Sequence, residues 1–421
     1  MSVNISGLRA SASLEQLRKQ ARELQRSHRS GDTDAVARVA AQLDEPRPVL
    51  SLSEAQYVLA AELGFASWPK LVSSLTPRFT TRTRREGDRV WLDGVPRLRW
   101  GTSAEPTYLG ALEAAFRSSD RPLDLTALMG DSGLCFRLRW ATRDGGNVWC
   151  GSGPAGEWPD EVSALNRATG YVFGWGPQRE GRGWLESLQR RVVESIDKGW
   201  PILGFGAQMD MAVVYGYEAG GARVLLSDYW ANEDPSVMPI GEAKEIGMLI
   251  EQIHEPAGRV DSVRAGLSLA LKRWREGVVD VDPNSGATYY YGAAGYDRWM
   301  ADLSRFEELD EGQRANLYFL NSWTYSSLHQ NRSGHAARYL RSADLGETAA
   351  ASLEAAAACY DRMAERLGRW DPADPRFGFA KQQPIASWTA DVRADEAATL
   401  TDLLALDTEA MGHIERAIAT Q

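Results

Sequence analysis

The spacing of apolar residues changes twice along this chain, and these changes limit the folds open to it. Residues 11–75 and the segment beyond residue 262 repeat apolar side chains every three or four positions, which predicts helices. The helices predicted in the second segment include 263–276, 313–342 and 347–367, and alternating apolar residues predict a strand at 135–141. Between them, residues 201–228 hold three apolar runs of strand length, and the last two are joined by a glycine-containing turn at 218–221. Helices on both sides of an antiparallel hairpin predict an α+β fold rather than a doubly wound one.

The length of 421 residues is sufficient for two to four domains. Arginines at 76–99 are interrupted by Thr, Glu, Gly and Asp, so we interpret this stretch as a solvated connection rather than a nucleic-acid-binding arm. We therefore predict a helical module at 1–78, a linker at 79–87, an α+β domain at 88–262 and a helical bundle at 263–421.

Composition excludes several classes of protein. The formal net charge of −10 leaves no overall cationic surface for nucleic acid or anionic lipid. No run of 18 apolar residues exists, and residues 1–16 lack an apolar core of signal-peptide length, so we expect no membrane segment. The three cysteines form no C-x-x-C pair, which argues against a disulfide framework or a thiolate zinc site and favours a cytoplasmic protein. We expect no metal and no cofactor.

Three short motifs match known signatures but lack the context that each chemistry needs. The G-x-G-x-x-G at 151–156 contains a proline and does not precede a clear helix, so a dinucleotide site is not expected. The Gly-Asp-Ser-Gly at 130–133 copies a serine-protease segment, but only His28 lies upstream, and we interpret it as a turn. The acidic loop at 280–286 has Tyr291 where calcium needs a glutamate, and we interpret it as a turn between helices.

The placement of the histidines is the most informative absence in the sequence. The chain has five, and none lies between residues 29 and 253. A Ser-His or Cys-His pair within the α+β domain is thereby excluded unless His254 folds back onto it. His329 and His335 are six positions apart on one predicted helix, which places them on different faces and argues against a shared metal ion.

The N-terminal helical segment carries a first resemblance. LSEAQYVLAAELGFASWPKL at 52–71, with a helix cap expected at Ser53 and Gln56, resembles the short helical region that precedes ankyrin repeats in many bacterial proteins. No ankyrin repeat follows it here. We interpret the segment as a packing or docking module.

The middle segment carries a second resemblance, through five stretches. They are WGTSAEPTYLGALEAAF at 100–116, LMGDSGLCF at 128–136, PILGFG at 201–206, MAVVYGY at 211–217 and LSDYW at 226–230. Together they resemble the N-terminal domain of butirosin biosynthesis protein H, a papain-like family related to cysteine peptidases and implicated in acyl transfer. The resemblance implies a papain-like fold with a nucleophilic cysteine at the start of a central helix, a histidine on a strand and an orienting carboxylate or amide.

This sequence departs from that pattern at the two decisive places. Glu105 and Thr107, with a proline between them, stand where the cysteine should precede the helix. Asp210, between two methionines, stands where the histidine should open the strand. Asp228 matches the orienting carboxylate. The usual pairing of thiolate and base is therefore missing.

Two hypotheses follow from these departures. In the first, the protein performs acyl or amide chemistry on a small molecule or peptide, with the nucleophile moved to Cys150 or Cys135 and with Asp210 or Asp228 as base. Free cysteines are also common as small buried side chains, which is the alternative for both.

In the second hypothesis the domain is a catalytically inert papain-like protein that binds a small, cationic ligand or a peptide. Carboxylates at Glu105, Asp210 and Asp228 would supply negative charge beside Thr107. Aromatic walls would come from six tryptophans, of which at least half are expected in the core. These tryptophans are Trp100, Trp140, Trp149, Trp158, Trp175 and Trp230.

Overall fold

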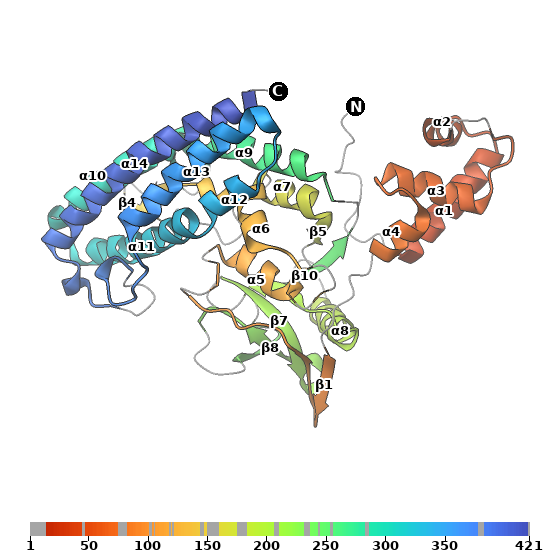
Figure 1. The fold of residues 1–421 in the computed structure, drawn as a ribbon. Helices are drawn as coiled ribbons and strands as arrows, with labels where there is room; N and C mark the ends of the chain where they lie inside the picture. Colours follow the sequence, from red (N-terminus) through yellow and green to blue (C-terminus); the bar gives the residue numbers. More distant parts are fainter. Residues whose placement is uncertain are drawn as a thin grey trace.

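The computed structural model has a mixed α+β fold that is mostly helical and contains two antiparallel sheets (Figure 1). This confirms the fold class predicted from the apolar spacing. The structure describes residues 14–43, 47–74, 82–100, 103–104, 106–117, 119, 122–143, 147–149, 160–174, 183–205, 210–230, 236–242, 245–252, 256–282, 286–377 and 383–419.

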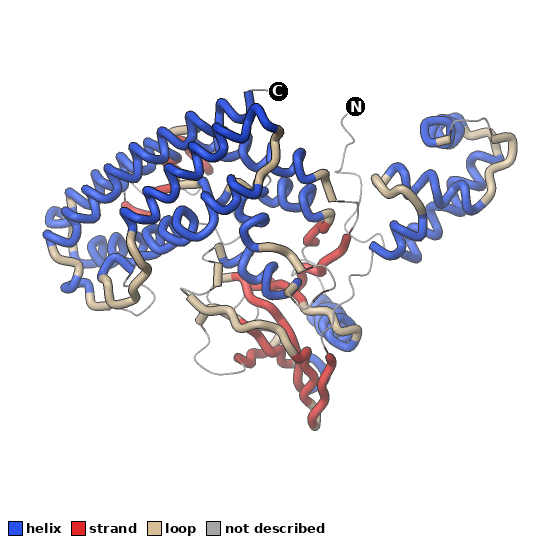
Figure 2. The backbone as a smooth tube through the Cα atoms, in the orientation of Figure 1, coloured by secondary structure: helices blue, strands red, loops and turns tan. Residues whose placement is uncertain are grey.

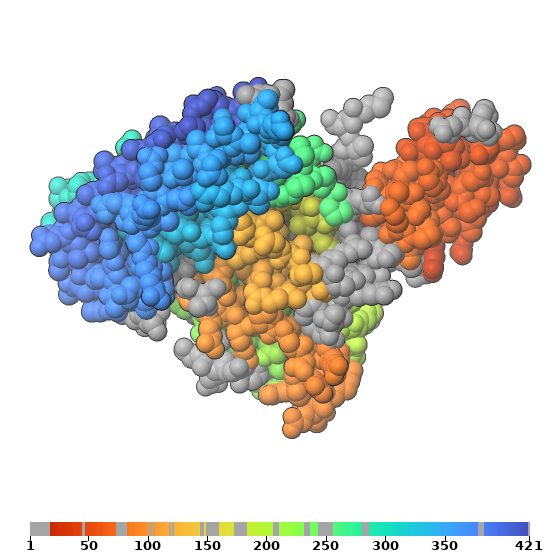
Figure 3. All heavy atoms as spheres, viewed as in Figure 1, coloured from red at the N-terminus to blue at the C-terminus, as the bar shows by residue number. Residues whose placement is uncertain are grey.

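The N-terminal helices form a unit of their own. They are α1 (Leu14–Arg29), α2 (Thr33–Gln42), α3 (Leu52–Glu62) and α4 (Trp68–Ser74). Their buried apolar side chains, Leu24, Val39 and Val58 among them, pack against one another within residues 17–71. Figures 1 and 3 show this unit to one side of the remaining helices and strands.

The cap of α3 lies two residues earlier than the sequence predicted. The Ser51 hydroxyl accepts from the Glu54 backbone N–H at 3.2 Å, and the Glu54 carboxylate accepts from the Ser51 N–H at 2.8 Å. Ser51 has an extended backbone, whereas Ser53 already lies in the first helical turn. The pairing of Ser53 with Gln56 is therefore wrong, because only a residue outside the helix can take the capping conformation.

Among the described residues, the larger sheet has eight strands. They are β1 (Arg82–Glu86), β2 (Arg89–Asp93), β5 (Tyr171–Gly174), β6 (Ile202–Phe205), β7 (Met211–Glu218), β8 (Arg223–Ser227), β9 (Ser236–Pro239) and β10 (Glu245–Gln252). Neighbours run β1-β2-β7-β6-β10-β5, while β8 pairs with both β7 and β9. The predicted hairpin is confirmed as β7 and β8, joined through Gly220 and Gly221, whose φ angles of 63° and 93° suit glycine.

Helices accompany this sheet on both faces. They are α5 (Thr107–Phe116), α6 (Leu125–Asp131), α7 (Asp160–Thr169) and α8 (Trp184–Asp197). Alternate residues of β7 face opposite sides: Met211 and Val213 pack into the cluster that contains α5, and Ala212 and Val214 pack into the one that contains α8. Strand β7 reads as a continuous apolar run because both of its faces are covered.

The smaller sheet joins two distant parts of the chain. Its order is β11 (Val278–Asp282), β12 (Ala287–Tyr291), β3 (Arg139–Arg143) and β4 (Asn147–Trp149). The strand predicted at 135–141 begins only at Arg139, because 134–136 form a 3₁₀ turn. The turn at 280–286 was expected between helices, and this is wrong, since it connects β11 to β12.

Apart from this hairpin, most of the described residues from 259 onward are helical. The helices are α9 (Arg259–Glu276), α10 (Gly292–Ser304), α11 (Glu311–His329), α12 (Ala337–Ser342), α13 (Glu347–Leu367) and α14 (Ala390–Ala419). The helix predicted over 313–342 is interrupted by a π-helical turn at Gln330–Ala336. Figure 2 shows how these helices cover one end of the molecule. None of the helices in the described ranges is long and apolar enough to span a bilayer.

One hydrophobic core runs through the middle segment and the C-terminal helices. Trp140 of β3 stacks on Trp299 of α10, with ring centroids 4.9 Å apart, and its indole N–H donates to Asp302 at 2.8 Å. The same core includes side chains of α5 and α14. Packing is therefore continuous across residue 262, where a domain boundary was predicted.

The Gly-Asp-Ser-Gly motif at 130–133 serves helix packing. A Cβ on Gly130 would lie 2.0 Å from the ring of Tyr339, and one on Gly266 would lie 2.2 Å from the Gly130 carbonyl oxygen. Ser132 is fully buried and donates to the Leu128 carbonyl at 2.7 Å. Gly130 and Asp131 are the last residues of α6, so the predicted turn is confirmed only at Ser132 and Gly133, and Ser132 is not accessible to a substrate.

Candidate functional site

The site begins where the first turn of α5 meets the first residue of β7. Thr107 opens the helix, is fully buried, and its hydroxyl accepts a hydrogen bond from the Met211 backbone N–H at 3.1 Å. The N-terminus of a helix carries a partial positive charge, which favours negative groups nearby. Contact between these two segments places Asp210, the residue before β7, near the start of α5.

Trp230 donates hydrogen bonds to two of the three carboxylates predicted for the site. Its indole Nε1 donates to Asp210 Oδ2 at 2.5 Å, and its backbone N–H donates to Asp228 Oδ1 at 2.8 Å. Asp228 directly follows β8, so the second bond is a local turn of the aspartate side chain onto the backbone two residues on. Asp210 and Asp228 come from adjacent antiparallel strands, and Trp230 fixes them relative to each other.

The environment of Asp210 disfavours its charged form. Its side chain is 6% exposed, and this burial raises the pKa of the Asp210 carboxyl to about 6, with a further contribution from the negative charge of Asp228. The hydrogen bond from Trp230 acts in the opposite direction. A positive charge placed beside this pair would favour the carboxylate form and would be attracted by both groups.

Trp100 brings together aromatic rings from three segments of the chain, including Trp230. The Trp100 ring centroid lies 4.5 Å from that of Tyr229, 5.6 Å from that of Trp230 and 6.1 Å from that of Trp323 on α11. We refer to Trp100, Tyr229, Trp230 and Trp323 as the aromatic cluster. The faces of such rings attract cations, so the cluster and the two carboxylates favour the same class of ligand.

A glycine on α5 allows the aromatic cluster to approach the helix. The Tyr229 hydroxyl donates to the Ala104 carbonyl at 2.5 Å, just before the start of α5. A Cβ on Gly110 would lie 1.9 Å from the Tyr229 hydroxyl oxygen. Gln330, in the π-helical turn, donates to the Ser103 carbonyl at 2.8 Å and so links the C-terminal helices to the same loop.

Four of the seven predicted site residues, Thr107, Asp210, Asp228 and Trp230, lie in this one place. Glu105 and Cys150 fall outside the described residues, as do the glycine motif at 151–156, His254, Trp158 and Trp175. The backbone of Trp149 lies in β4 of the smaller sheet, whereas Asp210 and Asp228 flank strands of the larger one.

The alternative nucleophile, Cys135, does not fit a catalytic role. It is fully buried in the 3₁₀ turn 134–136, and burial raises the pKa of its thiol far above the usual range. Its backbone carbonyl accepts from Arg332. The thiol is therefore protonated and inaccessible, so Cys135 is a core residue and its candidacy as a nucleophile is wrong.

Two members of the aromatic cluster, Tyr229 and Trp323, were not predicted from the sequence. Tyr229 lies inside the LSDYW stretch at 226–230, next to two residues that were singled out. Trp323 is on α11, remote in sequence, and the only signal for it is an aromatic repeat at helical spacing with Phe319, whose ring centroid is 6.4 Å away. Only the tertiary fold brings α11 to the site.

No protein-family model matches this chain, and a search against curated proteins finds no significant similarity. The site is therefore interpreted from its own geometry. It combines a pair of carboxylates, of which Asp210 is buried and Asp228 is half-buried, a helix N-terminus whose Thr107 hydroxyl is already bonded to the backbone, and an aromatic cluster.

Proposed function

We propose that the middle segment is a papain-like domain of the butirosin biosynthesis protein H type that has lost the Cys-His pair and binds a small organic cation, free or within a peptide. The ligand's positive group would lie beside Asp210 and Asp228, with the aromatic cluster around it. The observation that carries this proposal is that Trp230, a member of the cluster, donates to both carboxylates, to Asp210 from its ring and to Asp228 from its backbone N–H.

The residues at the expected positions of the nucleophile and the base support a binding function better than a catalytic one. The Thr107 hydroxyl is buried and accepts a backbone N–H, so it is not oriented for attack on a substrate. Asp210 stands where the histidine is expected, and an ionised carboxylate only accepts hydrogen bonds, whereas an imidazole could also donate one to the orienting Asp228. A carboxylate pair with aromatic neighbours is instead the arrangement that recognises ammonium and guanidinium groups.

The proposal is tested by comparing a cation with a neutral molecule of the same shape. Choline and 3,3-dimethyl-1-butanol differ mainly in the charge of the quaternary centre. We expect choline to raise the thermal midpoint of the full chain in a concentration-dependent way and the neutral alcohol to leave it unchanged. Putrescine and arginine methyl ester extend the series to primary ammonium and guanidinium groups. Equal effects of charged and neutral partners, or no effect of any cation, would contradict the proposal.

Acyl or amide chemistry is the second candidate, and one observation favours it. A pKa of about 6 suits Asp210 as a general base near neutral pH. Under this proposal Cys150 is the nucleophile, and iodoacetamide at pH 7 should label Cys150 much faster than Cys135 or Cys359, both of which are buried. Uniformly slow labelling would remove this candidate and leave the binding proposal standing. We also propose a cytoplasmic location, because the cysteines show no paired spacing.

A further inference from the structure

Three side chains of different metal-binding types meet where α13 packs against α14. Cys359 lies on α13, and Glu409 and His413 lie one turn apart on α14. One ligand atom from each, the thiol sulfur, a carboxylate oxygen and a ring nitrogen, lies within 4.8 Å of the other two. Figure 1 shows the two helices side by side along most of their lengths, and their packing fixes this cluster.

A positive group already bridges two of the three side chains. Arg362 Nη2 lies 3.2 Å from Cys359 Sγ and 2.7 Å from Glu409 Oε2. The arrangement of sulfur and carboxylate thus accepts a cation at this point. The Arg362 side chain is 50% exposed, so its guanidinium can move into solvent without breaking buried contacts.

The donor set selects among cations. A thiolate, an imidazole and a carboxylate suit a borderline-soft ion such as Zn²⁺, whereas Ca²⁺ and Mg²⁺ prefer oxygen ligands alone. Zinc bonds of about 2.0–2.3 Å place ligand atoms of a tetrahedral site roughly 3.3–3.8 Å apart, so a contraction of about 1 Å would suffice. Cys359 forms the buried end of the cluster, and the Glu409 side chain, 48% exposed, leaves the other end open to solvent.

We propose that Cys359, Glu409 and His413 bind a zinc-class divalent ion, with water as the fourth ligand and Arg362 displaced into solvent. The Cys359 thiol, which is 3.3 Å from the Ala355 carbonyl, gives up its proton to solvent as the metal–sulfur bond forms. His413 Nε2 faces Glu409 at 3.9 Å, and Arg416 lies 2.8 Å from Nδ1. Metal binding through Nε2 therefore requires the ring proton on Nδ1 and Arg416 turned away, which is possible at this exposed position.

The test is a Co²⁺ titration of the reduced, metal-free full chain followed by absorbance. We expect a thiolate-to-cobalt charge-transfer band in the near ultraviolet and visible bands of a tetrahedral ion, all removed by one equivalent of Zn²⁺. Cys359→Ser should abolish the charge-transfer band, and His413→Gln should weaken Co²⁺ binding at least tenfold. Cys135→Ser, Cys150→Ser and Asp210→Asn are controls that should leave the band unchanged, which separates this site from the carboxylate–aromatic site.

Arg362→Gln distinguishes a metal site from a purely structural ion pair. Removing the competing guanidinium should tighten Co²⁺ binding several-fold, whereas a structural role for Arg362 predicts no gain. No charge-transfer band in the parent protein, or an equal band in Cys359→Ser, would overturn the proposal. If Cys359→Ser does not fold, Co²⁺ binding to His413→Gln tests the proposal instead, because His413 is only partly buried and its replacement leaves the core intact.

Discussion

Arg332 and Asp407 form an ion pair of 2.8 Å in which both side chains are fully buried. Arg332 lies in the π-helical turn and also donates to the backbone carbonyl of Phe136 at 3.0 Å, while Tyr296 of α10 donates to Asp407 at 2.7 Å. One guanidinium therefore connects the 3₁₀ turn before β3, the π-helical turn and α14. Arg332 and Tyr296 both bind Asp407 Oδ2 and help to offset the cost of burying the two charges, whereas Asp407 Oδ1 is buried without a hydrogen-bond partner among the described residues.

Replacing Arg332 by methionine should strongly destabilise the protein. Asp407 would be left as an unpaired buried charge, and two backbone carbonyls would lose their donor, so we expect a loss of about 3–5 kcal/mol in the free energy of unfolding. The midpoint of urea-induced unfolding, compared between variant and parent, measures this loss. The double variant Arg332→Met/Asp407→Leu should recover part of the loss, because it removes both charges.

The matched control is Arg341→Met. Arg341 pairs with Glu354 and Asp361 at the surface, where solvent screens the interaction. The urea midpoint of the Arg341→Met variant should therefore hardly differ from that of the parent protein. Equal losses for Arg332→Met and Arg341→Met would mean that burial of the Arg332 pair does not govern its contribution.

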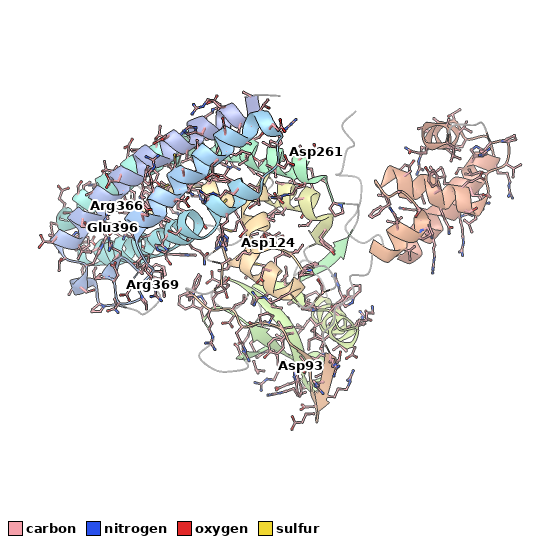
Figure 4. The ribbon with its side chains drawn as sticks, in the orientation of Figure 1. Asp93, Asp124, Asp261, Arg366, Arg369 and Glu396 are labelled. Atoms are coloured by element: carbon pink, nitrogen blue, oxygen red, sulfur yellow. The ribbon has the colours of Figure 1, made fainter. Side chains whose placement is uncertain are left out.

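Glu396 should make stability depend on pH in an unusual direction. It lies among the C-terminal helices (Figure 4), where Trp388 and Asn321 each donate to its carboxyl at 2.8 Å, and burial raises the pKa of Glu396 to about 7. Because the unfolded pKa is about 4.3, the folded state holds this proton more tightly. The contribution to stability is therefore greatest below about pH 4.3 and is lost as the pH rises to about 7, by at most about 1.4 kcal/mol per pH unit.

The comparison of Glu396→Gln with the parent isolates this effect. The thermal midpoint of the variant should improve relative to the parent between pH 5 and pH 8, since glutamine cannot ionise. Glu365→Gln, at an exposed position on α13, is the control and should show a constant difference across this range. A constant difference for Glu396→Gln as well would contradict the titration that we assign to Glu396.

Cation binding at the proposed site should strengthen with pH. A bound cation lowers the pKa of Asp210 from about 6, so binding releases a proton at acidic pH. The association constant for choline should therefore rise between pH 5 and pH 7 and then level off. Asp210→Asn should weaken binding about tenfold, equivalent to roughly 1.4 kcal/mol, and remove the pH dependence. Calorimetry at both pH values checks this, and an unchanged pH profile in the variant would exclude Asp210 as the titrating group.

Gly110→Ala should disrupt the aromatic cluster by direct overlap. The new methyl would lie 1.9 Å from the Tyr229 hydroxyl oxygen but 3.2 Å from the adjacent ring carbon. We expect a loss of about 1–3 kcal/mol in unfolding free energy together with weaker cation binding. Tyr229→Phe removes the overlapping atom, so the double variant should recover stability relative to Gly110→Ala. If the losses in unfolding free energy of Gly110→Ala and Tyr229→Phe simply add in the double variant, the overlap does not cause the destabilisation by Gly110→Ala.

The helices could be predicted from sequence, and the short strands largely could not. The predicted helix at 347–367 coincides with α13, and the helix at 263–276 lies within α9, because three-four spacing over several turns is a strong local signal. Strands β3 and β12 pair with each other although they are far apart in sequence. A strand of five residues carries little pattern of its own, and its pairing partner decides whether it forms.

The candidate site, too, could be predicted from the sequence only in part. Asp210 and Asp228 were assigned to one site through the papain-like resemblance, and the structure shows why they meet: Asp210 precedes β7 and Asp228 follows β8, and antiparallel neighbours bring the start of one strand close to the end of the next. Trp323 and the pair of Arg332 with Asp407 had no such signal. Each depends on a contact between segments that only the packed core brings together.

The sequence by itself determined the α+β class, the long helices and the hairpin, since these follow from apolar spacing and turn glycines within a few residues. It also determined that residues 29–253 contain no histidine. Tertiary structure decided that β3 and β4 share a sheet with β11 and β12, that Cys135 is a core residue, and that Trp230 joins Asp210 to Asp228. The physical reason is that burial and long-range pairing depend on which surfaces meet, and a local pattern specifies only that a surface is apolar or charged.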